Sequence, residues 1–270
     1  MLGAIIGDIV GSPYEFDRGT KSVNFPLFAA DANYTDDTLL TLALGQAMMD
    51  AAGDETIADE LIVRTMREFA ARYPLPKGGF GGRFTQWLLS KNPQPYGSFG
   101  NGSAMRVSSV GWLYDTLETT EHWAKISARV THNHPEGIKG AQATAAAIFL
   151  ARTEGATSHT KIRHRNYLAE RFGYDLSRSC DEIRVRHHHQ ETCQLSVPAA
   201  LSAYFESTDF ENALRLVISL GGDTDTEAAI TGAIAAAAYG IPEPIIIKGR
   251  SYLPPDLLAV LDRFSAFVEA

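Results

Sequence analysis

Two short acidic motifs carry the side chains best suited to chemistry. YTDDT occupies positions 34–38 and GGDTDT occupies positions 221–226, each directly before an apolar segment with helical periodicity. Aspartate and threonine often cap helices, because they accept hydrogen bonds from the first N–H groups. One cap needs only one side chain, whereas each motif holds two acids and two threonines. Capping therefore leaves several carboxylates unexplained.

A pair of hard divalent cations would explain the remaining carboxylates. Mg²⁺ and Mn²⁺ take oxygen ligands, and two such ions can share a bridging carboxylate. Carboxylates that face a protein interior without a cation are costly. Asp223 and Asp225 are two residues apart and do not share a helix face, so they should lie in a loop and first turn aimed at one point. Both a capping role and a metal-binding role fit these motifs.

A glycine-rich segment and two histidine segments are further candidates. GSFGNGSAMR at 97–106 leads into a predicted helix, and its backbone N–H groups could bind phosphate or simply form a capped turn. It matches neither the dinucleotide pattern nor a P-loop. His132 and His134, in THNHPEG, could contact a ligand or end a helix. The run at 187–189 has no common zinc spacing, and we interpret it as solvated.

The elements that must position these residues are helices. Periodicity and caps indicate a single all-α domain over residues 1–270, with one possible short strand at 181–186. Asp54 and Asp209 are expected to cap helices, and Pro198 is expected at a helix start. The predicted helices are 38–52, 55–73, 83–90, 103–117, 120–129, 136–152, 158–172, 198–206, 209–220, 225–239 and 254–268.

Composition restricts the class of protein. The formal net charge is −8 and no basic cluster is present, which argues against a nucleic-acid partner. Asp8 interrupts the first apolar run, which is not a signal peptide, and no later run is long enough to cross a membrane. Two cysteines support no disulfide framework. We expect a cytoplasmic monomer.

In combination, these residues resemble the ADP-ribosylglycohydrolase family. The resemblance runs in order along nearly the whole chain. The chain is similar to the compact bacterial type of this family. Its segments are GAIIGDIVGSPYEF, YTDDT, GSFGNGSAMRV, THNHPEGIKGAQATA, CQLSVPAALSAYFES and ISLGGDTDTEAAITGAIA.

The resemblance implies an orthogonal all-α bundle with a binuclear metal site in a cleft. It implies two Mg²⁺ or Mn²⁺ ions held by six residues and a family acid, Glu15, near the second ion, so that Glu15, Asp36, Asp37 and Asp225 are the candidate catalytic residues. The implied metal ligands are Thr35, Asp36, Asp37, Asp223, Asp225 and Thr226. The implied binding residues for ADP-ribose are Ser98, Gly100, Asn101, Gly102, Ser103 and His132.

The implied reaction is hydrolysis of the bond between ribose C1″ and a modified acceptor, which releases ADP-ribose. Some arginine-specific members of the family carry an aspartate where this chain has Ser98, so the linkage that is cleaved stays open between arginine and an oxygen acceptor. Modified nucleic acid and a free metabolite also stay open as acceptors. Two other functions are considered: a metal-dependent phosphoester or nucleotide hydrolase, and an inactive ADP-ribose-binding protein.

Overall fold

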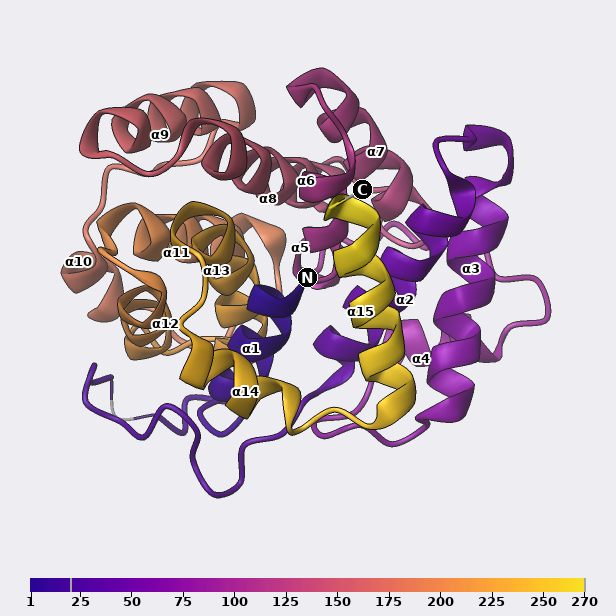
Figure 1. Cartoon of the computed structure of the whole chain (residues 1–270), viewed down its shortest axis with the longest axis horizontal. Coiled ribbons are helices and arrows are strands. Elements are labelled where there is room, and N and C mark those ends of the chain that lie inside the picture. The colour runs from indigo at the N-terminus through magenta and orange to yellow at the C-terminus, as the bar shows by residue number, and fades with distance from the viewer. Residues whose placement is uncertain (20, 270) are drawn as a thin grey trace.

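A computed structural model describes residues 1–19 and 21–269 of the chain. These residues form helices and connecting loops, with two isolated bridges and no strand among them (Figure 1). The all-α prediction is therefore confirmed. The helices are α1 (Leu2–Gly11), α2 (Asp36–Ala51), α3 (Glu55–Arg72), α4 (Gly82–Leu89), α5 (Gly102–Met105), the 3₁₀ turn η1 (Val107–Ser109), α6 (Val110–Leu113), α7 (Leu117–Arg129), α8 (Pro135–Glu154), α9 (Ser158–Phe172), α10 (Cys180–Arg184), α11 (Cys193–Glu206), α12 (Phe210–Ser219), α13 (Thr224–Tyr239), α14 (Glu243–Arg250) and α15 (Pro255–Glu269).

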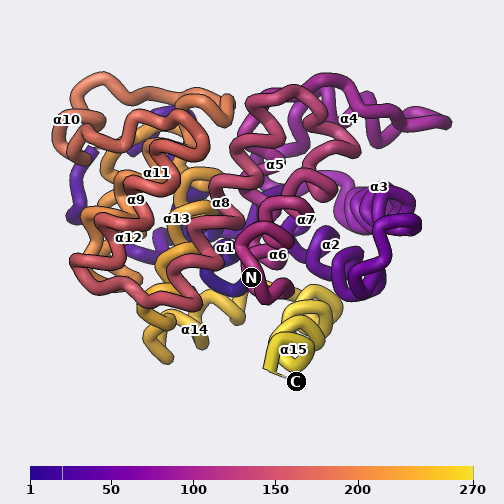
Figure 2. Tube along the Cα trace, turned by 90° about the horizontal axis from the view of Figure 1, so that it is seen from above, coloured from indigo at the N-terminus to yellow at the C-terminus, as the bar shows by residue number. Residues whose placement is uncertain are grey.

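Helix α1 lies against α13 at the centre of the bundle, with α2 on its other side (Figures 1 and 2). Glycine allows this close approach: a Cβ on Gly7 would lie 2.0 Å from the carbonyl oxygen of Ala228. Gly3 and Gly11, one turn away on either side, meet the α13 backbone in the same way. This contact brings the first turn of α13 beside the end of α1.

Two helix starts agree with the sequence at the aspartate caps that were predicted for them, those of α3 and α12. Asp54 accepts a hydrogen bond from the Thr56 N–H at 2.9 Å, and Asp209 accepts one from the Asn212 N–H at 2.8 Å. Both predicted caps are confirmed. Helices α1 and α14 were not predicted; α1 has no side-chain cap hydrogen bond and is apolar on nearly every face.

Three predictions about local structure are wrong. The predicted strand at 181–186 is the helix α10, because Ser179 and Glu182 form a capping box at its start. The predicted helix 103–117 is three short pieces. The last piece ends at Leu113, because the backbone of Tyr114 is extended. Pro198 lies inside α11, which begins at Cys193 and continues through it; the hydrogen bond that Pro198 cannot make would have gone to the carbonyl of Gln194, an exposed residue.

No helix of the described chain is both long and apolar enough to span a membrane.

Candidate functional site

Helix starts bring the two acidic motifs together. Thr35 is the N-cap of α2, and its hydroxyl accepts the Asp37 N–H at 3.1 Å. Asp223 occupies the N-cap position of α13, and Asp225 accepts the Thr226 N–H at 2.9 Å. The packing of α1 between α2 and α13 places these two first turns at the same end of the bundle. Thr35 therefore caps α2, whereas Asp223 makes no side-chain cap hydrogen bond at the start of α13.

A glutamate completes the cluster from the turn that follows α1. One carboxylate oxygen each of Glu15, Asp223 and Asp225 lie within 4.8 Å of one another. Glu15 is half-buried, whereas Asp223 and Asp225 are buried. The structure thus brings Glu15 to the acids of the second motif.

Asp8 is a member of the cluster that the sequence analysis did not identify as a site residue. One of its oxygens accepts the Thr35 N–H at 3.0 Å and the Thr38 N–H at 3.1 Å, so that α1 caps α2. Its other oxygen, Oδ1, is buried and has no hydrogen-bond partner. Its signal in the sequence is a single acid within an otherwise apolar run.

The cluster is strongly electronegative. Burial, and then the charge of Asp225, raise the pKa of Asp8 to about 7 and that of Glu15 to about 8. The same two causes raise the pKa values of Asp36, Asp37 and Asp223 well above the usual range. Within the described chain, no lysine or arginine forms an ion pair with any carboxylate of the cluster, which consists of Asp8, Glu15, Asp36, Asp37, Asp223 and Asp225.

These properties fit divalent cations. Oδ1 of Asp8 and Oδ1 of Asp37 are buried without a partner, and an acceptor oxygen in that state needs a donor or a cation. Every group available is an oxygen, which Mg²⁺ and Mn²⁺ prefer and zinc does not. The donor set therefore suits a hard divalent ion rather than a structural zinc ion.

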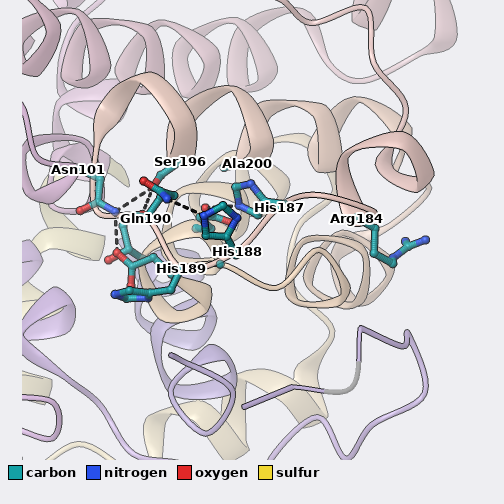
Figure 3. Close-up of polar contacts among 12 residues, drawn as sticks. Asn101, Arg184, His187, His188, His189, Gln190, Ser196 and Ala200 are labelled. Carbon is teal, nitrogen blue, oxygen red and sulfur yellow. Dashed lines mark hydrogen bonds and ion pairs between the residues drawn. The ribbon is translucent and has the colours of Figure 1, made fainter. Parts of the chain in front are cut away.

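The glycine-rich loop lies opposite the carboxylates. Asn101 and Gly102 line the cleft with Ser98 and Gly100, but the side chain of Ser103 does not, since its hydroxyl donates to the carbonyl of Gly137 at 2.7 Å. The Asn101 amide nitrogen donates to Asp223 at 2.7 Å and to Ser196 at 3.0 Å. Asn101 therefore links the loop directly to the acidic cluster (Figure 3).

His132 is held in a defined orientation beside this loop. The Arg106 guanidinium, which is almost fully buried, donates to the Thr131 hydroxyl at 2.8 Å, and that hydroxyl lies 2.7 Å from Nδ1 of His132. Because Arg106 donates to the Thr131 hydroxyl and no other acceptor for its proton is found among the described residues, that hydroxyl donates to Nδ1 and leaves the His132 Nε2–H free to donate. Burial, followed by the charges of Arg106 and Arg83, lowers the pKa of His132 well below its usual value.

These groups line one cleft of about 430 Å³. Its walls also carry Arg83 and the aromatic rings of Phe80, Tyr96 and Phe99. A larger hollow of about 880 Å³ lies between α3 and α4 and contains none of the predicted site residues. The cleft therefore combines a cluster of carboxylates, the glycine-rich loop at a helix start, and flat aromatic surfaces.

The interpretation of residues 187–189 as a solvated run is wrong for His187. Its side chain is 10% exposed, and Nε2 lies 2.8 Å from the fully buried Glu227 carboxylate (Figure 3). His188 is exposed, as expected, and its ring forms hydrogen bonds with the Arg186 carbonyl and Gln190. The partner of His187 lies 40 residues away in sequence, which hid this pairing from the sequence pattern.

The fold is an all-α bundle in which a cluster of carboxylates and a glycine-rich loop line one cleft. The sequence model described as ADP-ribosylglycohydrolase matches residues 1–266. The chain belongs to this family.

Known proteins agree with that assignment. An uncharacterized protein of Archaeoglobus fulgidus is 37% identical, covering 94% of this chain and 92% of its own. Human ADP-ribosylhydrolase ARH3 is 28% identical, covering 96% and 90%. A solved structure titled as an ADP-ribosylglycohydrolase-related protein complex superposes with a TM-score of 0.66 at 21% identity, covering 99% of this chain and 94% of that one, which supports the fold.

Proposed function

We propose that this protein is a metal-dependent hydrolase that cleaves the bond between ribose C1″ and an acceptor, releasing ADP-ribose. The observation that carries the proposal is the cluster of carboxylates without a cationic partner at one side of the cleft. Family membership supports hydrolysis of ADP-ribosylated acceptors, and relatives with such activity in their names are similar over nearly the whole chain.

The wall opposite the cluster suits an ADP-ribose group. The backbone N–H of Gly102 can bind the diphosphate, whereas the N–H groups of Gly100 and Asn101 already donate to the Ser98 hydroxyl and the Glu191 carbonyl; the glycines leave room for close approach of the ligand. The Nε2–H of His132 adds a neutral donor that does not depend on pH in the physiological range. Phe99 and Tyr96 offer ring faces on which a purine can stack.

Thr35, Asp36, Asp37, Asp223, Asp225 and Thr226 are the residues that would hold two Mg²⁺ or Mn²⁺ ions. When bound, these ions supply Lewis acidity and a template that orients ribose hydroxyls and water. Asp8 lies behind these residues and fixes the start of α2 through its hydrogen bonds.

The chain's own groups manage charge and protons. As the bond from C1″ to the acceptor breaks, positive charge develops at C1″, and the surrounding carboxylates stabilise it. A water oxygen forms the new bond to C1″. Glu15, which has no ion pair of its own, can accept the water proton and return one to the acceptor atom.

The acceptor linkage depends on Ser98. Its side chain lines the cleft and accepts the Gly100 N–H at 3.2 Å, so it presents no negative charge to a guanidinium. We therefore expect an oxygen-linked acceptor, such as ADP-ribosyl-serine or a small ester, to be cleaved faster than ADP-ribosyl-arginine. We also propose that the chain acts as one domain and a monomer.

The test is release of free ADP-ribose from serine- and arginine-linked ADP-ribosyl peptides, with Mg²⁺ or Mn²⁺ and with EDTA as the control. Metal-dependent release is expected, and Asp36→Ala protein that is still folded should lose it. Wild-type turnover by the folded Asp36→Ala variant would contradict the proposal. Release of inorganic phosphate from a nucleotide instead would favour the phosphoester hydrolase, and tight ADP-ribose binding without turnover of either peptide would favour the inactive binder.

A further inference from the structure

The loop between α10 and α11, residues 185–192, contacts both segments that contribute acids from the two ends of the chain. One segment is the turn that follows α1 and carries Glu15. The other is the turn at Gly221–Asp223, which leads into α13. The loop therefore lies beside two segments that are far from it, and from each other, in sequence.

His187 supports the α13 turn from behind. Its Nε2 contacts Glu227, which is fully buried in the first turn of α13, two residues after Asp225. The imidazole also lies against the backbone of Gly222: a Cβ there would be 2.5 Å from Nε2. Gly222 has a φ of +93°, so this turn requires glycine on both conformational and steric grounds. The ring thus fixes both the turn and the helix start that present Asp223 and Asp225.

Asp17 joins the Glu15 segment to the same two places. Its carboxylate accepts the His189 N–H at 3.0 Å and the Gly222 N–H at 3.2 Å. Phe16 and Asp17 both have left-handed φ values, +59° and +56°, which persist only when surrounding contacts hold them. Because Glu15 immediately precedes this strained pair, the contacts of Asp17 determine where the Glu15 carboxylate lies.

A second connection runs from the loop through α11 to the cluster. The Ser196 hydroxyl donates to the Gln190 carbonyl at 2.9 Å and accepts from the Asn101 amide at 3.0 Å. The same amide donates to Asp223 at 2.7 Å. The loop conformation is thus coupled to Asp223 from the side of the glycine-rich loop as well.

We propose that His187 and Asp17 are positioning residues that hold Glu15 and the Asp223–Asp225 turn in one arrangement, so that the protein binds divalent cations tightly. Glu15 itself forms no ion pair in the described chain. The loop instead holds the segment of Glu15 through the hydrogen bonds between the His189 N–H and Asp17. Residues that orient the ligands of a metal contribute about 10- to 100-fold to metal affinity. The role of the bound metal in turnover rests on the proposed function. The positioning role does not, because cation binding is measured separately from turnover.

The experiment compares His187→Ala and Asp17→Ala with His188→Ala, an exposed neighbour in the same loop. Mn²⁺ affinity is measured by calorimetry on folded protein, and kcat and KM are measured on an ADP-ribosyl peptide at saturating Mn²⁺. We expect Mn²⁺ affinity to fall about 10- to 100-fold in the first two variants and to be unchanged in the third. His187→Gln, which keeps a donor for Glu227, should recover most of the affinity.

Each outcome decides the matter. Wild-type Mn²⁺ affinity in folded His187→Ala and Asp17→Ala overturns the inference, as does an equal loss in His188→Ala. A lower melting temperature with unchanged Mn²⁺ affinity indicates a merely structural role and also overturns it. If Mn²⁺ affinity falls as expected but the wild-type protein releases no ADP-ribose from any substrate, the positioning role stands and the proposed function fails.

Discussion

The pKa of aspartate shifts in opposite directions at two helix starts of this protein. Asp54 is exposed and caps α3. Hydrogen bonds from the Thr56 hydroxyl and from the Thr56 N–H lower its pKa. Asp223 occupies the corresponding position of α13, yet burial and the charge of Asp225 raise its pKa. Neighbouring charge and solvent, rather than residue type or helix position, separate a structural cap from a candidate metal ligand.

Asp225→Asn should separate stability from cation binding. After burial, the charge of Asp225 is the main cause that raises the pKa of Asp8, Glu15 and Asp37, so its removal relieves repulsion in the metal-free protein. At pH 8 with EDTA we expect a melting temperature a few degrees higher, on the scale of about 2–4 °C per kcal/mol. Calorimetry should show that Mn²⁺ binding is lost. A less stable variant with intact Mn²⁺ binding would contradict the role given to Asp225.

Thr131→Val should weaken ADP-ribose binding without altering cation binding. The substitution removes the hydroxyl that receives the Arg106 hydrogen bond and directs Nδ1 of His132. Loss of one such contact costs about 1–2 kcal/mol, which is about 5- to 30-fold in the ADP-ribose dissociation constant measured by calorimetry. Thr131→Ser, which retains the hydroxyl, is the matched control. Equal ADP-ribose affinity in the valine variant and the wild type would argue against a fixed His132 tautomer.

Among the helices, α3 and α12, each with an aspartate cap, could be predicted from sequence, and α1 could not. The sequence around α1 gives no cap and no polar face, because α1 is buried on nearly all sides. The candidate site follows the same division. Motif residues such as Asp36 were found because they stand at helix starts, whereas Glu227 was missed because its partner His187 is distant in sequence.

Gly7→Ala should disrupt the contact between α1 and α13. The added Cβ would lie 2.0 Å from the Ala228 carbonyl oxygen. The atoms that it meets belong to the α13 backbone, so no side chain can move aside to remove the overlap. Overpacking of this kind typically costs about 1–3 kcal/mol or more, and separation of the helices should also weaken Mn²⁺ binding. Gly82→Ala is the control, because nothing lies within 4 Å of a Cβ at that position. Denaturant titration of both variants measures the difference, and equal stability would show that α1 can move away without cost.

The molecule as a whole holds together a group of acids that repel one another. Three short segments, the two ends of the chain and the loop at 185–192, converge on them, so the site exists only when the full bundle is assembled. We therefore expect the single domain proposed above to unfold in one cooperative transition, measured by calorimetry and circular dichroism together. Two separate transitions in the metal-free protein would contradict this.

The stability of the metal-free protein should fall as the pH rises from 6.5 to 8.5. The pKa values of Asp8 and Glu15 are raised in the folded state to about 7 and about 8, so between these values and the unfolded pKa the folded protein binds more protons than the unfolded chain. Stability from such groups is present at low pH and is lost as the pH rises through the folded pKa. Saturating Mn²⁺ should reverse the trend, because the cation binds the ionised cluster and stabilises the folded state by about 2.7 kcal/mol at 100 times its dissociation constant. Melting temperatures with EDTA and with Mn²⁺ at the two pH values test both signs; a stabilisation by Mn²⁺ that is no larger at pH 8.5 than at pH 6.5 would mean that the cation does not bind these carboxylates.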